Sequence, residues 1–177
     1  TAGRIAAENG KIEGLDEHER IILFQKIGLG ALKYFILKVD PKKRILFDPL
    51  ASVDFNGNTG PFIQYTYARI QSLVQKVEGE LVFHLDLSLV DKEKEILKHL
   101  STYPALVKSA GEQYSPALIA NYLYELVKMF NSFYQNVSVI GTNDHKLKSL
   151  RLLLCKAVAN NIESASGLLG IDLPDRM

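Results

Sequence analysis

Aromatic side chains and one arginine recur at helical spacing directly after a turn, in the stretch Asn56–Arg69. The turn holds two glycines, and Pro61 suits the first position of a helix. Phe62, Tyr65 and Arg69 then follow at spacings of three and four residues, so they share one stripe of that helix. Aromatic rings and a guanidinium plane stack unpaired nucleobases, and a guanidinium also binds phosphate. The stripe is therefore a candidate binding surface.

The same helix carries a second, apolar stripe typical of a helix that faces a core. Its members are Ile63, Tyr67, Ile70, Val74 and Val77. The polar side is expected to hold Gln64, Gln71 and Gln75. The candidate binding stripe continues to Leu73, so a helix buried between two neighbours would also explain the pattern. In that case Arg69 stacks on Tyr65 or pairs with a carboxylate, and periodicity alone favours this packing interpretation.

Residue patterns suited to catalysis or metal binding are missing from the sequence. The glycines near Pro61 lack the spacing and the lysine of a phosphate-binding loop, and no nucleophile elbow occurs. The four histidines are scattered: His18, His84, His99 and His145. Glu93 and Glu95 lie in a charged run, which predicts a solvent-exposed helix face. Cys155 lies in an apolar helical stretch and is expected to be a buried structural thiol, so the polypeptide by itself does not resemble an enzyme.

Composition indicates a globular protein of one domain, with or without a short appendage. The chain has 177 residues, of which 47% are hydrophobic and 23% charged. A single cysteine excludes a disulfide framework and favours a reducing compartment. The net charge is +1 with both signs well mixed, whereas proteins that bind duplex nucleic acid alone are usually more basic. No apolar run reaches the ~20 residues of a membrane span and no signal peptide is visible, so a cytoplasmic protein without a membrane partner is expected.

The spacing of apolar residues predicts an all-α fold with one long loop. The expected helices cover residues 1–9, 16–38, 61–77, 88–103, 104–110, 116–135 and 144–167. Four starts have capping signals: Asp16 with Glu19, Ser88 with Asp91, Ser115 before Pro116, and Asp144. Residues 44–47 are expected to form a short strand, 48–60 a loop and 79–87 a connector. Gly28 and Gly30 weaken their helix, which a close packing contact would explain.

Three segments of this chain resemble arginyl-tRNA synthetase, a class I aminoacyl-tRNA synthetase. The first is "GLGALKYFILKVDPKKRILFDPLASVDFNGNTGPFIQYTYARIQSL", which is long and specific. The second is the helix "SPALIANYLYELVKMFNSFYQN", and the third is the terminal "LLGIDLPDRM". Together they cover nearly the whole chain in the order found in the family.

The resemblance implies a helical bundle of the class I synthetase anticodon-binding type. Residues 1–56 correspond to a junction that follows the catalytic domain, and 57–177 to the anticodon-binding domain. The family is an arginine–tRNA ligase that uses ATP with magnesium, but the HIGH-type and KMSKS-type motifs are absent here. This part is therefore expected to be inactive alone, to need no cofactor, and to select tRNA(Arg) by its anticodon loop. Its other implied partner is the catalytic domain of the same enzyme, and a monomer is expected.

The family's anticodon-binding residues map onto six positions of this chain: Phe62, Gln64, Tyr65, Arg69, Tyr122 and Met177. In the family they help to form a pocket for the central cytidine of the anticodon. A free carboxylate at Met177 would accept a hydrogen bond from the cytidine amino group. The family commonly has tyrosine at Phe62, so a hydroxyl is lost there while stacking remains. Tyr122 also aligns with apolar residues of its helix, and a core position explains it equally well.

A different class of function remains open beside tRNA binding. The chain would then be a helical protein-interaction or scaffold module whose candidate binding stripe contacts a partner helix. That function predicts no dependence on RNA and predicts self-association or partner binding through the same face.

Overall fold

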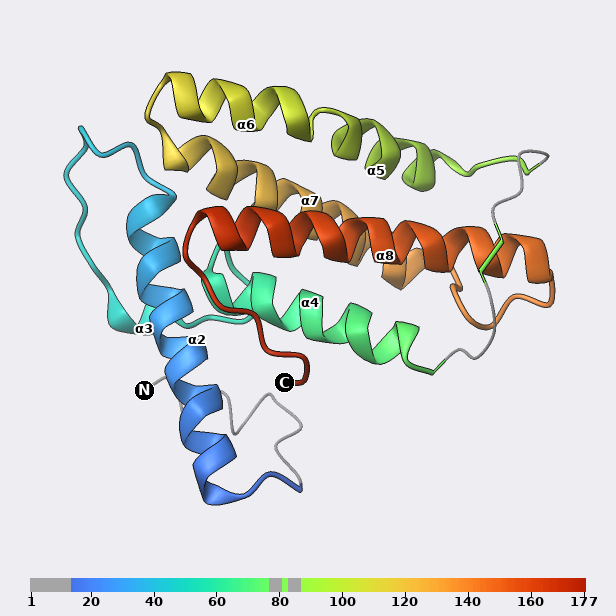
Figure 1. The fold of residues 1–177 in the computed structure, drawn as a ribbon, viewed down its shortest axis with the longest axis horizontal. Coiled ribbons are helices and arrows are strands. Elements are labelled where there is room, and N and C mark those ends of the chain that lie inside the picture. Colours follow the sequence, from blue (N-terminus) through green and yellow to red (C-terminus); the bar gives the residue numbers. More distant parts are fainter. Residues whose placement is uncertain (1–13, 77–80, 83–86) are drawn as a thin grey trace.

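The computed structural model describes residues 14–76, 81–82 and 87–177, most of which are helical (Figure 1). The helices are α2 (Glu17–Leu37), α3 (Pro49–Ser52), α4 (Gly60–Val74), α5 (Asp91–Ser101), α6 (Tyr103–Glu112), α7 (Pro116–Asn136) and α8 (His145–Leu168). No strand occurs in these ranges, which confirms the all-α prediction and shows that the strand expected at 44–47 is wrong. The helix expected at 1–9, Val77 and most of the connector lie outside the described residues.

Side-chain caps explain where the long helices begin. Asp16 accepts a hydrogen bond from the backbone N–H of Glu19 at 2.8 Å, and the Glu19 carboxylate accepts one from the Asp16 N–H at 2.9 Å. This is the predicted capping box of α2. The Asp144 side chain accepts from two N–H groups in the first turn of α8, and Thr59 caps α4. The predicted start of α7 after Ser115 is confirmed, but the Ser115 side chain makes no capping hydrogen bond.

Two predictions about helix starts and loops are wrong. The helix after the connector begins at Asp91 with Val90 as its N-cap, so Ser88 is not the capping residue. Valine has no side-chain acceptor, and the backbone N–H of Val90 instead donates to the Glu93 carboxylate at 2.9 Å. Within the predicted loop 48–60, Asp48 caps the single-turn helix α3 by accepting from the N–H groups of Leu50 and Ala51.

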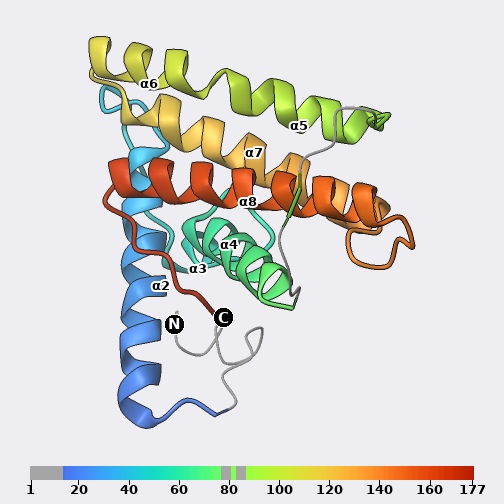
Figure 2. The same ribbon diagram turned by 45° about the vertical axis from the view of Figure 1, so that its right-hand side comes forward.

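The helices form a bundle with one helix placed across its end. In Figure 1, α4, α7 and α8 pack side by side, and α5 and α6 lie along α7. The turned view in Figure 2 shows α2 upright at one end, where it contacts α4. Ile63, Tyr67 and Ile70 of α4 are buried in the core between α4, α7 and α8. The predicted core stripe of α4, including Tyr67, is therefore confirmed at these positions.

Two glycines allow α2 and α4 to touch through their backbones. A Cβ on Gly60 would collide with the carbonyl oxygen of Gly30 and would lie 3.0 Å from the amide nitrogen of Ala31. A Cβ on Gly30 would lie 2.5 Å from the side-chain nitrogen of Gln64. The packing contact expected from the small residues of α2 is therefore present at Gly30. It brings the first turn of α4 against the middle of α2.

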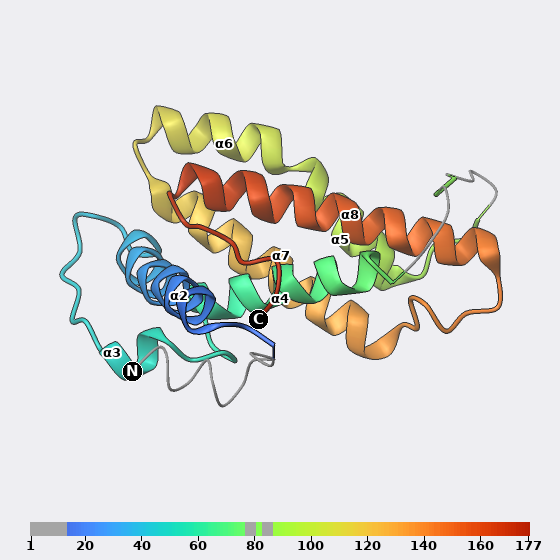
Figure 3. The same ribbon diagram turned by 60° about the horizontal axis from the view of Figure 1, so that its bottom comes forward.

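Gln64 lies inside this contact, not on the polar side of α4 as the sequence predicted. Its side chain is 0% exposed. The amide nitrogen donates to the carbonyl oxygen of Lys26 in α2 at 3.0 Å and to that of Asp172 at 2.8 Å. Gln64 thus joins three segments, because Asp172 belongs to the C-terminal segment that leaves α8 and ends beside α4 (Figure 3). The periodicity of α4 could not reveal this, because the crossing helix α2 buries a third face.

The turn before α4 is also held by α2. The Lys38 amine donates to the backbone carbonyl of Asn58 at 2.7 Å. The Tyr34 hydroxyl lies 2.5 Å from the side-chain oxygen of Asn58 and 3.0 Å from the carbonyl oxygen of Ala120 in α7. Burial raises the pKa of Tyr34 well above its usual value and lowers that of Lys38. These contacts fix the position at which α4 begins.

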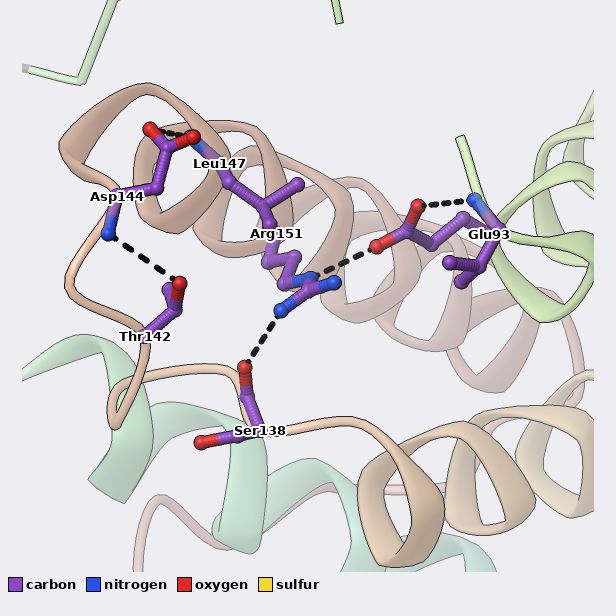
Figure 4. A network of polar contacts seen from close by, with 7 residues as sticks. Glu93, Ser138, Thr142, Asp144, Leu147 and Arg151 are labelled. Carbon is purple, nitrogen blue, oxygen red and sulfur yellow. Dashed lines mark hydrogen bonds and ion pairs between the residues drawn. The ribbon is translucent and has the colours of Figure 1, made fainter. Parts of the chain in front are cut away.

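A buried ion pair joins α5 to α8 (Figure 4). Arg151 donates from Nε to the Glu93 carboxylate and from Nη1 to the carbonyl of Ser138, both at 2.8 Å. The Glu93 side chain is 1% exposed and that of Arg151 10%. The prediction that Glu93 belongs to a solvated helix face is therefore wrong. The charged run concealed the residue because its buried partner is 58 positions away in the sequence.

We expect Gly60→Ala to lower the free energy of unfolding by about 1–3 kcal/mol, because the added methyl group overpacks a backbone contact. Gly111→Ala is the matched control. A Cβ at Gly111 meets nothing within 4 Å, and alanine favours a helix over glycine by about 1 kcal/mol. Urea unfolding of both variants measures the difference. Equal stability of the two alanine variants would contradict the proposed contact.

We expect Glu93→Gln to lower the free energy of unfolding by about 3–5 kcal/mol, because it leaves the buried Arg151 charge without a counterion. Asp91→Asn is the control on the same helix, since its ion pair with Lys94 is exposed and such pairs contribute little. Chemical denaturation monitored by circular dichroism compares the two variants. A Glu93→Gln protein as stable as the Asp91→Asn protein would show that the pair is dispensable.

Candidate nucleic-acid interface

An open cavity of about 240 Å³ lies between α4, the end of α7 and the C-terminal segment. Its lining residues are Tyr65, Ala68, Arg69, Ser72, Leu73, Lys76, Tyr134 and Met177. Pockets for drug-sized ligands usually measure about 300–1,000 Å³, so this cavity suits a smaller group. Its mixture of aromatic and cationic side chains suits a flat, electron-rich group joined to an anion.

Arg69 is the central side chain of the cavity. Its Cζ lies 4.7 Å from the ring centre of Tyr65 and 5.3 Å from that of Tyr134. Both distances are within the range of cation–π attraction, about 6 Å. Its Nη1 donates a hydrogen bond to the side-chain oxygen of Asn131 on α7. The guanidinium is therefore held against two aromatic rings that come from two different helices.

Tyr65 is fixed from behind by a small apolar cluster separate from the main core. The cluster consists of Leu23, Ile27, Phe55, Ala68 and Met177, with Leu15, Phe24 and Tyr65 packed against it. The rings of Phe55 and Tyr65 meet edge to face, with centres 6.0 Å apart. Met177 is 8% exposed. Its side chain thus forms part of the cavity wall and also anchors the C-terminal segment.

The structure brings Tyr65, Arg69 and Met177 together, as three of the six predicted positions. Phe62 lies on the same stripe but does not line the cavity. It is half-buried against the main core, with its ring centre 6.2 Å from that of Tyr124. The residues of the stripe therefore differ in environment. Phe62 packs against the main core, whereas Tyr65 and Arg69 line the cavity.

Gln64 and Tyr122 lie away from the cavity, contrary to the prediction. Tyr122 is 4% exposed and stacks on the ring of His99, with centres 4.3 Å apart. Its hydroxyl donates to the side-chain oxygen of Asn161 at 3.1 Å, and burial raises its pKa well above the usual value. The core interpretation of Tyr122 is thus correct. It could be foreseen from the apolar residues in line with it on the helix.

Three polar or aromatic residues of this region were missed by the sequence analysis: Lys76, Asn131 and Tyr134. Tyr134 is 37% exposed and follows Asn131 by three residues, so both face α4 from one side of α7. The signal available in the sequence was this spacing within "VKMFNSFYQN". The family resemblance instead placed the binding role of this helix at Tyr122, near its start.

Metal-binding candidates and the single cysteine can be placed within the described residues. Within the described ranges, no three His, Cys, Asp or Glu side chains are placed to hold a metal ion. Cys155 is buried, as predicted, and burial raises its pKa to about 12, so the thiol stays protonated near neutral pH. None of the helices in the described part of the chain is long and apolar enough to cross a membrane.

Comparison with known proteins identifies the family of this chain. Residues 63–177 match the family described as DALR anticodon binding domain. The whole chain is 53% identical to an arginine–tRNA ligase of Flavobacterium psychrophilum and 48% identical to one of Porphyromonas gingivalis. It spans 30% of the length of each of these relatives.

A solved structure extends the agreement to three dimensions. Thermus thermophilus arginyl-tRNA synthetase superposes on 99% of this chain with a TM-score of 0.91 and 27% identity, and 30% of that chain is covered. The sequence match, the curated relatives and the shared fold all agree. The chain therefore belongs to the arginyl-tRNA synthetase family and contains its DALR anticodon-binding domain.

Proposed function

We propose that the cavity between α4, α7 and the C-terminal segment binds an unpaired base of the anticodon loop of tRNA(Arg). The observation that carries the proposal is the position of Arg69 between Tyr65 and Tyr134. Rings and a guanidinium in contact offer stacking surfaces and hydrogen-bond donors at the same place. Cytidine, the base implied by the family resemblance, fits this donor set because its N3 and O2 are adjacent acceptors.

The proposed site consists of Tyr65, Arg69, Tyr134, Met177 and Lys76. A splayed base stacks on the exposed part of Tyr134, while N–H groups of Arg69 donate to its edge. Lys76 is exposed at the end of α4 and is placed to neutralise a neighbouring phosphate. Phe62 supports the site from the core, so the hydroxyl of the usual tyrosine is not required for stacking.

In the complete protein this region acts as part of a larger ligase. We propose that the whole enzyme attaches arginine to tRNA with ATP and magnesium, as a cytoplasmic monomer, and that this region alone is inactive. Residues 1–56 then form the junction to the catalytic domain and 57–177 the anticodon-binding domain. An exposed apolar face on α2 supports the junction, since such a patch favours a protein contact. It consists of Ile21, Ile22, Leu29, Leu32 and Ile36.

We expect Tyr65→Ala and Tyr134→Ala each to weaken binding of tRNA(Arg) by about one to two decades, since stacking of a base on an aromatic ring contributes about 1–3 kcal/mol. Replacing the central anticodon cytidine should weaken binding of the unmodified protein as well. Gel-shift titrations with the full-length protein at fixed salt measure both effects.

Tyr114→Ala is the matched control for these titrations. Tyr114 is 89% exposed and lies at the turn between α6 and α7, outside the cavity. Circular dichroism of every variant verifies folding. Binding that ignores the central base and both cavity tyrosines would reject the proposal. RNA-independent self-association that Tyr65→Ala abolishes would instead favour a protein-interaction module.

A further inference from the structure

We infer that Asn131 positions Arg69 and thereby sets the preference of the cavity for one base over another. The inference rests on the proposed function and adds a residue that does not line the cavity. Asn131 is 9% exposed and lies on α7, behind the guanidinium. It is a positioning residue, because it acts on the ligand only through Arg69.

The orientation of the Asn131 amide is determined by its other partners. Its nitrogen donates to the carbonyl oxygen of Val127 at 2.9 Å and to the hydroxyl oxygen of Thr66 at 2.8 Å. A carbonyl oxygen can only accept, so the nitrogen must face Val127. The Thr66 hydroxyl donates to the carbonyl of Phe62 at 2.9 Å, which leaves its oxygen to accept from Asn131. The side-chain oxygen of Asn131 is therefore left facing Arg69.

This arrangement fixes the orientation in which the Arg69 guanidinium offers its hydrogen-bond donors. A guanidinium has five N–H donors, and one of them donates to Asn131. In the described part of the chain no hydrogen bond is found for the other four. Because two rings lie against the group and Asn131 holds one end, the guanidinium cannot rotate freely. The edge formed by Nε–H and one Nη2–H takes no part in the bond to Asn131 and is left to donate to a base stacked on Tyr134.

A guanidinium edge held in one orientation can distinguish cytosine from uracil. Cytosine has two adjacent acceptors, N3 and O2, which match two N–H groups of one guanidinium. Uracil has an N–H at position 3, which would face another donor. If Arg69 were free to turn, it could approach either uracil carbonyl alone, and the difference between the two bases would shrink. The hydrogen bond that Arg69 donates to Asn131 therefore affects the ratio of the two affinities more than their mean.

The experiment measures binding of two tRNA(Arg) transcripts, with cytidine or uridine at the central anticodon position, to variants of the full-length protein. Asn131→Leu removes the acceptor at nearly constant volume and should reduce the cytidine preference about tenfold, as expected for a lost bond to a charged group. Asn131→Asp keeps an acceptor for Arg69 and should retain the preference, although it loses both donors and should be less stable. Asn121→Leu, at an exposed position of α7, is the control and should leave the preference unchanged.

A second arm tests whether Asn131 acts through Arg69. In an Arg69→Ala background, Asn131→Leu should change the preference no further. If Asn131→Leu fails to fold, Asn131→Ala removes the same acceptor with a smaller side chain and should lower the preference in the same direction. A folded Asn131→Leu or Asn131→Ala protein with the unmodified protein's preference overturns the inference. The inference is also overturned if Asn131→Leu lowers the cytidine preference in the Arg69→Ala background. It is likewise overturned if the preference falls in proportion to the loss of stability in both the Asn131→Asp and the Asn131→Leu proteins.

The outcomes also separate the inference from the proposed function. If the unmodified protein shows no preference for cytidine, the proposed function fails and the inference fails with it. If it shows the preference and Asn131 does not affect it, only the inference fails.

Discussion

The backbone contact between α2 and α4 at Gly30 and Gly60 is the constraint on which the rest of the structure depends. It places the first turn of α4 directly against the backbone of α2. Gln64 is then enclosed, and its amide joins α2 to the C-terminal segment through Lys26 and Asp172. Because rotation of α4 would break both hydrogen bonds of the buried amide nitrogen, this arrangement allows little rotation of α4 about its axis.

The fixed rotation of α4 determines what each of its faces does. Ile63 and Ile70 enter the main core, and Tyr65 and Arg69 face the space between α4 and α7. The segment anchored by Gln64 continues to Met177, which completes the wall of that space. A single close approach therefore forms the cavity from three segments that are far apart in the sequence. Local sequence patterns predict the helices, but they do not predict the cavity that the helices form together.

The sequence predicted the elements better than the contacts between them. Helix starts depend on neighbouring residues, so Asp16 and Asp144 were identified correctly. Glu93 and Gln64 were misplaced because their partners come from segments distant in the sequence, which no periodicity reveals. The family resemblance selected Tyr65 and Arg69, which line the cavity, and also Tyr122, which lies in the core as the apolar pattern of its own helix allowed.

The cavity is coupled to stability because its residues are shared with packing clusters. Tyr65 lines the cavity and also meets the ring of Phe55, which lies in the cluster with Leu23 and Ile27 of α2. If the proposed base binds there and moves Tyr65, it therefore acts on the contact between α2 and the bundle. If α2 joins a catalytic domain, this cluster is a short physical path from a bound anticodon to that junction. The path consists of packed side chains on rigid helices, which is the kind of connection that can transmit a small displacement.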